Sequence, residues 1–184
     1  MCDDQIELVE PAYRWVDAYM RSVEHPANTN DPTTNTTRAQ VLDLLAKEPR
    51  GRGQPPASAV PSYRFWVRHR GVDHADRPIA GAVSLRISDS FDTVEYFGHI
   101  GYHIFPASRG KHLAERATRL LLPFVRQHGK THVWITCDPG NIASQRTLER
   151  LDAEFVETVN VPVEHPLFER SQQKSRFLLR LDRV

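Results

Sequence analysis

The spacing of hydrophobic positions divides the chain into short strands and amphipathic helices. Runs rich in β-branched and aromatic residues predict strands over 6–9, 63–69, 79–87, 98–105, 131–137, 154–161 and 176–181. Hydrophobic residues at steps of three and four predict helices that start at Pro11 and cover 38–47, 109–128 and 141–151. This order of elements predicts a mixed α/β fold with a central sheet of about six to seven strands flanked by helices.

The helix predicted over 109–128 carries the strongest amphipathic pattern. Its buried face is expected to contain Leu113, Ala117, Leu120, Leu121 and Phe124. Pro123 lacks a backbone donor, so it should kink the helix or end its regular part. Gly129 is the expected C-terminal stop. Two stretches rich in proline and small polar residues, 26–37 and 49–61, are predicted loops.

Composition narrows the class of protein. The chain has 184 residues, which fits one domain over 1–184, and its 24 Lys and Arg nearly balance its 23 Asp and Glu. A nucleic-acid-binding protein usually has a clear basic excess, so we expect no nucleic-acid partner. Cys2 and Cys137 give no disulfide framework and no metal-binding CxxC pattern. The acidic start has no signal peptide, and no apolar run is long enough for a membrane span, so we expect a cytoplasmic protein without membrane attachment.

The turn between the strand at 98–105 and the following helix is the segment richest in chemistry. Pro106, Ala107 and Ser108 are followed by Arg109-Gly110-Lys111-His112-Leu113-Ala114, which leads into the helix. Free N–H groups and the positive end of the dipole meet at a helix N-terminus, where they favour an anion. Arg109 and Lys111 add positive charge, so the turn suits a pyrophosphate. A solvated basic turn is the simpler alternative for so short a motif.

Residues 62–160 resemble the GCN5-related N-acetyltransferase (GNAT) superfamily. The family's acyl-CoA motif, Arg/Gln-x-x-Gly-x-Gly/Ala after the fourth strand, matches the hexapeptide 109–114, and the strand HIGYHIFP before it resembles the family's IGYxxxP strand. The run from Ile135 to Ser144 resembles a branch of predicted acetyltransferases with an ITCDxxNxAS segment. Two motifs in the right order are more specific than either alone.

The resemblance implies acetyl-CoA as the cosubstrate. In the family the fourth and fifth strands splay apart and the pantetheine arm lies in the gap. Ile104 and Phe105 would offer it backbone groups, and the N–H groups of Gly110, Lys111, His112, Leu113 and Ala114 would hold the pyrophosphate. Asn141 matches the family's pantetheine-binding Asn, with Ser144 one turn further on. Asn141 also suits a helix N-cap, and both roles are compatible.

Two positions depart from the family pattern. His112 replaces the motif's first glycine, and its Cβ should hinder close approach of a phosphate unless the imidazole binds an oxygen. Leu148 stands where many members have a tyrosine that protonates the leaving thiolate. The sulfur must then take its proton elsewhere or leave as a thiolate.

Acetylation of an amine needs a base, because most alkyl amines are protonated at neutral pH. His99 occupies about the place of the glutamate that many members use, and His103 follows on the same strand. We predict His99 first and His103 second as the base, with a half-buried structural role as the alternative. The two are about 13 Å apart along a regular strand, too far to share a zinc ion, and no metal is expected. Cys137 lacks the partners of a covalent catalyst.

The acceptor is the least determined feature. The stretch 162–173 is long for a strand connection and carries Glu164, His165, Phe168 and Glu169, which suit either a solvated loop or a surface for a cationic amine. The expected reaction is direct acetyl transfer from acetyl-CoA to a small-molecule amine, or to a protein or peptide amine, in a ternary complex. The alternative is a catalytically weak or inactive acyl-CoA-binding or partner-binding domain. A phosphate site for another nucleotide fits less well, and a homodimer is compatible with the family.

Overall fold

The computed structural model describes residues 1–28, 31, 34–47, 52–53, 62–71 and 75–183. Contacts within the chain define two compact units. The first unit joins Met1–Ser84 with Tyr102–Leu121, and the second joins Leu85–Gly101 with Leu122–Val184. Helices and strands alternate along both, so the predicted mixed α/β class is confirmed.

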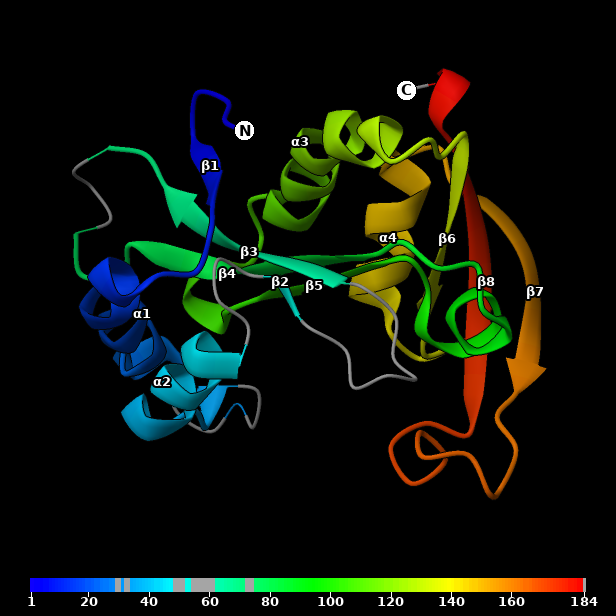
Figure 1. Ribbon diagram of the computed structural model, residues 1–184, viewed down its shortest axis with the longest axis horizontal. Coiled ribbons are helices and arrows are strands. Elements are labelled where there is room, and N and C mark those ends of the chain that lie inside the picture. Colours follow the sequence, from blue (N-terminus) through cyan, green and yellow to red (C-terminus); the bar gives the residue numbers. More distant parts are fainter. Residues whose placement is uncertain (29–30, 32–33, 48–51, 54–61, 72–74, 184) are drawn as a thin grey trace. The chain divides into compact units, whose positions relative to one another are not determined.

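One sheet has the strand order β1-β3-β4-β5, with β2 beside β3 (Figure 1). Its strands are β1 (Ile6–Val9), β2 (Arg52–Gly53), β3 (Ser62–His69), β4 (Ile79–Arg86) and β5 (Ile100–Ile104). β1 pairs antiparallel with β3, with Ile6 opposite His69 and Val9 opposite Trp66. β1 alternates between buried and half-buried residues, and β4 does so after its first three residues, which are all buried.

Helices α1 (Val16–Val23) and α2 (Arg38–Lys47) lie side by side in the first unit (Figure 1). Val16 and Met20 of α1 and Leu45 of α2 share one hydrophobic cluster with Trp66 and Phe105 of the sheet region. The apolar stripe read in the sequence is therefore the face that packs inward.

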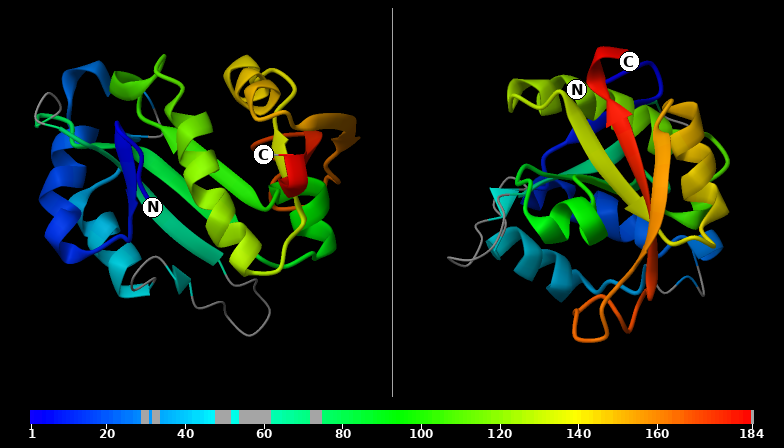
Figure 2. Two further views of the ribbon diagram at one scale, coloured as in Figure 1. Left: turned by 90° about the horizontal axis from the view of Figure 1, so that it is seen from above. Right: turned by 90° about the vertical axis from the view of Figure 1, so that its right-hand side faces the viewer.

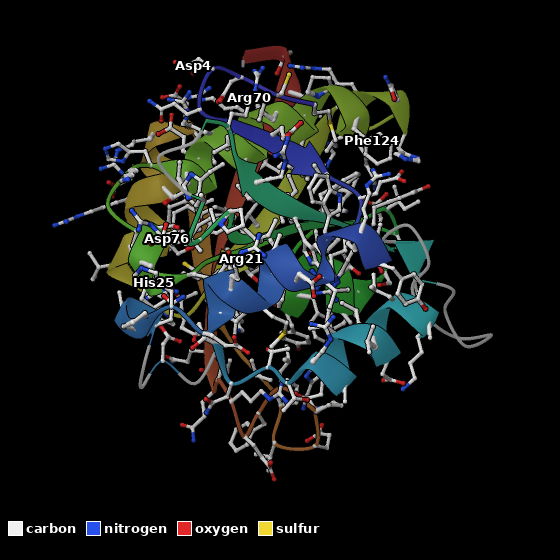
Figure 3. The ribbon with its side chains drawn as sticks, turned by 90° about the vertical axis from the view of Figure 1, so that its left-hand side faces the viewer. Asp4, Arg21, His25, Arg70, Asp76 and Phe124 are labelled. Carbon is white, nitrogen blue, oxygen red and sulfur yellow. The ribbon has the colours of Figure 1, made fainter. Side chains whose placement is uncertain are left out.

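Ion pairs lie on the surface just after the C-terminal end of α1. His25 Nε2 lies 3.2 Å from Asp76 Oδ2, and Figure 3 shows these side chains together, with Arg21 also on α1. Asp76 also pairs with Arg77 and is more than half exposed. Solvent screens exposed pairs of this kind, so they contribute little to stability.

A second sheet has the order β6-β8-β7 (Figure 2). It consists of β6 (His132–Cys137), β7 (Glu154–Asn160) and β8 (Gln173–Arg180), with both neighbouring pairs antiparallel. The central strand β8 starts three residues before the predicted strand, because the polar residues Gln173 to Ser175 hid its beginning. Helix α4 (Ile142–Arg150) follows β6 and buries Leu148 completely.

Helix α3 (Leu113–Gln127) begins four residues later than predicted. The backbone of Gly110 and His112 is left-handed, with φ of +80° and +54°, and a left-handed residue cannot continue a right-handed helix. Leu113, Ala117 and Leu121 are buried as expected. Pro123 does not end the helix, which continues to Gln127, and Gly129 follows with φ +76° as the predicted stop.

The chain between β4 and β5 contains an element that the sequence pattern did not predict. Residues Thr93–Phe97 form a short π-helical turn, in which Thr93 and Tyr96 are buried. β5 consequently begins at Ile100, two residues later than predicted. β5 and β6 belong to different sheets. Within the described residues, no helix is long and apolar enough to cross a membrane.

Candidate functional site

The turn after β5 presents backbone amides at the start of α3. Pro106–Ser108 form a 3-10 turn in which the N–H groups of Ser108 and Arg109 bond back to Phe105 O and Pro106 O. The helical bonding pattern begins with Arg116 N–H, which donates to His112 O at 3.1 Å. N–H groups ahead of that point have no acceptor within the helix. A helix N-terminus of this kind can donate hydrogen bonds from its amides to an anion.

Side chains of the first unit hold this turn in place. Asn28 is buried, and its Oδ1 accepts a hydrogen bond from Ala107 N–H at 2.9 Å. The Ser108 hydroxyl lies 3.0 Å from Nε2 of His69, and both residues are buried. Both anchors are buried side chains, so the turn is fixed from inside the first unit.

Arg109 is oriented by two partners. Its Nη2 donates to Asp31 Oδ2 at 2.8 Å and its Nε donates to Ile104 O at 2.9 Å. The side chain is still 51% exposed, so the guanidinium retains donors for an outside anion. Lys111 is exposed on the same turn.

The backbone groups predicted for the pantetheine arm already take part in hydrogen bonds. Phe105 N–H donates to Ala80 O at 2.8 Å, and Phe105 O accepts from Ser108 N–H. Ile104 O accepts from Arg109 Nε. A carbonyl oxygen has two lone pairs, so Ile104 O and Phe105 O retain capacity for one more donor each.

His103 has a nitrogen without a partner. Its Nε2 is buried and makes no hydrogen bond with any described residue. The ring packs edge-on against Phe105, with 5.5 Å between centroids. Burial, helped by the positive charge of Arg109, lowers the pKa of His103 below its ordinary value. At neutral pH the ring is therefore uncharged and able to accept a proton.

His99 is bonded at both ring nitrogens. Nδ1 accepts a hydrogen bond from Trp134 N–H at 3.0 Å, and Nε2 lies 2.9 Å from Asp89 Oδ1. The side chain is fully buried. Burial lowers the pKa of His99, although the hydrogen bond to Asp89 opposes the shift. The hydrogen bond from Lys130 in turn holds the pKa of Asp89 below its usual range. The role of His99 as a base stays a prediction, and these contacts weigh against it.

The residues after β6 form a helix start. Asn141 Oδ1 accepts a hydrogen bond from Ser144 N–H at 3.1 Å, which makes Asn141 the N-cap of α4 as predicted. Ser144 is buried beside Cys137, and burial raises the pKa of the Cys137 thiol. Leu148 lies in the hydrophobic core, so this position of the chain offers no proton.

An open pocket of about 790 Å³ lies in the second unit. It is formed by the loop before α4 and by the connection between β7 and β8, and its lining includes Asp138, Asn160, Phe168, Glu169 and Gln173. Burial opposes ionisation of Asp138, but hydrogen bonds from Lys174 at 2.5 Å and Ser171 at 2.6 Å hold its pKa below the usual range. Lys174 neutralises Asp138 and Arg170 also lines the pocket, so the pocket contains charges of both signs.

The long connection at 162–173 divides into two parts. Phe168 and Glu169 line the pocket, as a surface for an acceptor would require. His165 instead packs its ring against Tyr96, with 4.7 Å between centroids, and its Nδ1 accepts from Leu167 N–H. Its side chain is 10% exposed, so His165 supports the loop from within.

Sequence reasoning missed the partners of these side chains. Asp31, Asp89 and Lys130 stand in segments with no motif, so only the folded chain brings them to Arg109 and His99. Asp138 was noted only as part of a motif, without its link to Lys174. In the described part of the chain, no three His, Cys, Asp or Glu side chains gather as a metal site would require.

Comparison with known structures shows the same fold. A GNAT acetyltransferase from Bacillus anthracis aligns with TM-score 0.67 at 14% identity, over 99% of this chain and 98% of that one. RimL, a ribosomal L7/L12 alpha-N-protein acetyltransferase in complex with coenzyme A, aligns with TM-score 0.64 at 14% identity over 99% and 97%. The microcin C7 self-immunity acetyltransferase MccE, in complex with acetyl-CoA and AMP, gives 0.62 at 14% over 96% and 92%. At such identities the likeness establishes the fold alone.

The family of this chain is shown by its match to a sequence model of a protein family. No protein with a curated description matches the chain significantly. The family model described as the acetyltransferase (GNAT) domain matches residues 8–154, which extends well before the segment where the motifs are evident. This match covers most of the chain and includes the turn at the start of α3. The chain therefore belongs to the GNAT acetyltransferase family.

Proposed function

We propose that this protein is an N-acetyltransferase that transfers the acetyl group of acetyl-CoA to a primary amine by direct attack in a ternary complex. The observation that carries the proposal is the anchored turn after β5, in which left-handed residues precede the amides of α3 and Arg109 is held in position by Asp31. This is the arrangement that a pyrophosphate requires.

The chain's own groups account for binding of the cosubstrate. Amides of Gly110 to Ala114, with Arg109 and Lys111, would hold the pyrophosphate. Ile104 O and Phe105 O, through their remaining lone pairs, and Asn141 and Ser144 would contact the pantetheine arm. His112 has a φ of +54°, a left-handed conformation that glycine adopts readily, so its backbone is compatible with a position that is glycine in the family motif.

For the chemical step we propose His103 as the general base. Its lowered pKa keeps the ring neutral at pH 7, and its Nε2 has no partner among the described residues. The amine gives a proton to His103 as its nitrogen forms a bond to the thioester carbonyl carbon, and the carbon–sulfur bond then breaks. Leu148 supplies no proton, so the sulfur leaves as a thiolate and is protonated by solvent.

The acceptor is proposed to bind at the pocket beside Asp138 and Glu169, whose lining offers polar groups to an amine. A protein or peptide amine is one candidate, because RimL, a structural neighbour, is a ribosomal-protein acetyltransferase. A small-molecule amine is the other. We also propose membership of the narrower branch with the ITCDxxNxAS segment, on residues 135–144.

Titration calorimetry with acetyl-CoA tests the binding site. Arg109→Glu places a second carboxylate beside Asp31 and against the pyrophosphate, so the affinity should fall by about 10- to 100-fold, or about 1.4–2.8 kcal/mol. Arg21→Glu on α1 is the matched control, since it changes net charge equally and should leave the affinity unchanged. Equal affinity in the Arg109 variant would contradict the pyrophosphate site.

Release of free thiol across a panel of amines tests turnover. Binding of acetyl-CoA without thiol release on any amine would favour the alternative, a GNAT-like domain that binds acyl-CoA without catalysis. His112 and Leu148 are the residues that support this alternative. Competition by free CoA, but not by ATP or NAD, would separate both from a site for another nucleotide.

A further inference from the structure

The chain changes its neighbouring strand within one residue at the start of β5. His99 N–H donates to Trp134 O of β6 at 2.6 Å, whereas His99 O accepts from Arg86 N–H of β4 at 2.7 Å. In a regular strand the N–H and C=O of one residue point to the same neighbour. At His99 they point to different strands, so one backbone bond to β6 and one to β4 share this residue.

Gly98 makes the approach to β6 possible. Its φ is +69°, which favours glycine. A Cβ at this position would lie 2.9 Å from Thr136 N and 3.1 Å from Ile135 Cα, and both are backbone atoms of β6. The chain passes β6 here at a distance that only a glycine tolerates.

The His99 side chain takes a hydrogen bond that belongs to β6. Trp134 N–H donates to Nδ1, so Nδ1 carries a lone pair and the neutral ring has its proton on Nε2, directed at Asp89. A strand that continued alongside β6 would accept this N–H with a backbone carbonyl. The imidazole replaces that carbonyl, and Trp134 N–H is satisfied although the strands part.

We propose that His99 is a positioning residue whose imidazole accepts the Trp134 N–H and so fixes the point where the chain leaves β6 for β4. It transfers no proton in the reaction. The role of His99 in the backbone does not depend on the proposed function. Only the statement that it takes no part in acetyl transfer rests on that function.

The groups around the ring agree with a neutral imidazole. Asp89 faces Nε2 from the segment after β4, and Lys130 Nζ lies 2.6 Å from Asp89 Oδ1 and 3.4 Å from Nε2. His132 of β6 adds a further repulsive contribution when it is charged. Lys130 shares the carboxylate that would otherwise stabilise a charged ring. Protonation of Nδ1 would also set two donors against each other, because Trp134 N–H already points there.

Nitrogen NMR of the His99 ring in the wild-type protein is the first test. We expect one tautomer with the proton on Nε2, unchanged from about pH 8 to about pH 6, below the ordinary histidine pKa of about 6.5. A proton on Nδ1, or titration of His99 within this interval, would overturn the proposal. This measurement needs neither acetyl-CoA nor an acceptor, so it is independent of the proposed function.

Two variants separate positioning from base catalysis. In His99→Asn the amide oxygen can accept from Trp134 N–H, whereas His99→Leu has no acceptor. We expect protection of the Trp134 amide from hydrogen exchange in the wild type and the Asn variant, and its loss in the Leu variant. Equal protection in Leu and wild type would contradict the role. If the Leu variant does not fold, the Asn variant and the wild-type spectra still decide.

Turnover gives the complementary readout. With an amine that releases thiol, His99→Asn should retain the wild-type pH profile and a rate within about threefold, because its backbone support is preserved. A base would lose about 10²- to 10⁴-fold on this substitution. Such a loss with Trp134 still protected would identify His99 as the base and end the proposal.

Discussion

The two ends of β5 differ in how completely their polar groups are bonded. At the start, both ring nitrogens of His99 and both of its backbone groups have partners inside the chain. At the end, His103 Nε2 is buried without a partner among the described residues, and the turn that follows leads to the free amides of α3. The same residue type therefore stands in opposite surroundings just before β5 and within it.

This difference in hydrogen bonding distinguishes a histidine with a structural role from one that can react. A histidine with every nitrogen engaged stabilises the backbone but has no lone pair for a substrate. A buried nitrogen without a partner costs free energy, about 1–3 kcal/mol, and functional sites are where such costs are retained. His99, which is fully hydrogen-bonded, therefore supports the fold, whereas His103, whose Nε2 has no partner among the described residues, is the one able to react.

Removing the reactive nitrogen should have the largest effect. His103→Gln keeps a polar side chain of similar length but cannot accept a proton, so turnover should fall by about 10²- to 10⁴-fold. Acetyl-CoA affinity measured by calorimetry should stay close to wild type, because the pyrophosphate groups are untouched. His99→Asn is the matched control in the thiol-release assay. A wild-type rate in His103→Gln would remove this base from the mechanism.

The buried, hydrogen-bonded state of His99 should make the free energy of unfolding depend on pH. Burial keeps folded His99 neutral, whereas the unfolded chain takes up a proton near pH 6.5, so acid favours unfolding. Stability should be full above about pH 6.5 and fall below it, by at most about 1.4 kcal/mol per pH unit for this group. Burial also lowers the pKa of His103, so His103 makes the free energy of unfolding fall with decreasing pH in the same direction.

Urea unfolding at several pH values isolates the share of His99. His99→Asn should lose stability less steeply than the wild type between about pH 6.5 and pH 5, because only the slope of His103 and other groups remains. Parallel slopes for the two proteins would mean that folded His99 is protonated as readily as unfolded His99.

The smallest effect is expected at the turn beyond β5. His112 has φ +54°, a conformation that costs a side-chain-bearing residue about 1–2 kcal/mol. His112→Gly should raise the free energy of unfolding by up to about 1 kcal/mol, since the entropy of glycine offsets part of the gain. Thermal unfolding should show a midpoint higher by a few degrees, about 2–4 °C.

Gly110→Ala is the opposite change in the same turn. Gly110 has φ +80°, and the space that a Cβ would enter is open, so the alanine would be strained by its backbone alone and should lower the midpoint. Similar midpoints for both variants and the wild type would show that the left-handed turn carries no strain.

Local patterns predicted most of the fold. The bounds of α2 and of most strands followed from hydrophobic periodicity, whereas β2 lies inside the loop predicted over 49–61. Two errors have a common cause. The late start of α3 and the π-helical turn at Thr93–Phe97 depend on unusual backbone conformations, which hydrophobic spacing does not record.

The candidate site was predictable only in part. The hexapeptide 109–114 indicated the phosphate-binding turn, and Asn141 was expected as the N-cap that it is. No spacing in the sequence indicated that Asp31 would hold Arg109, 78 residues away, or that Asn28 would anchor Ala107. Such pairings depend on which segments the packed sheet brings together.

The sequence by itself determined the order of strands and helices and the family motif, because both are local and are written in consecutive residues. The tertiary structure alone decided which histidine is bonded and which is not, since His99 and His103 have the same intrinsic chemistry. Burial, the carboxylate of Asp89 and the amide of Trp134 make the difference, and all three reach His99 only through folding.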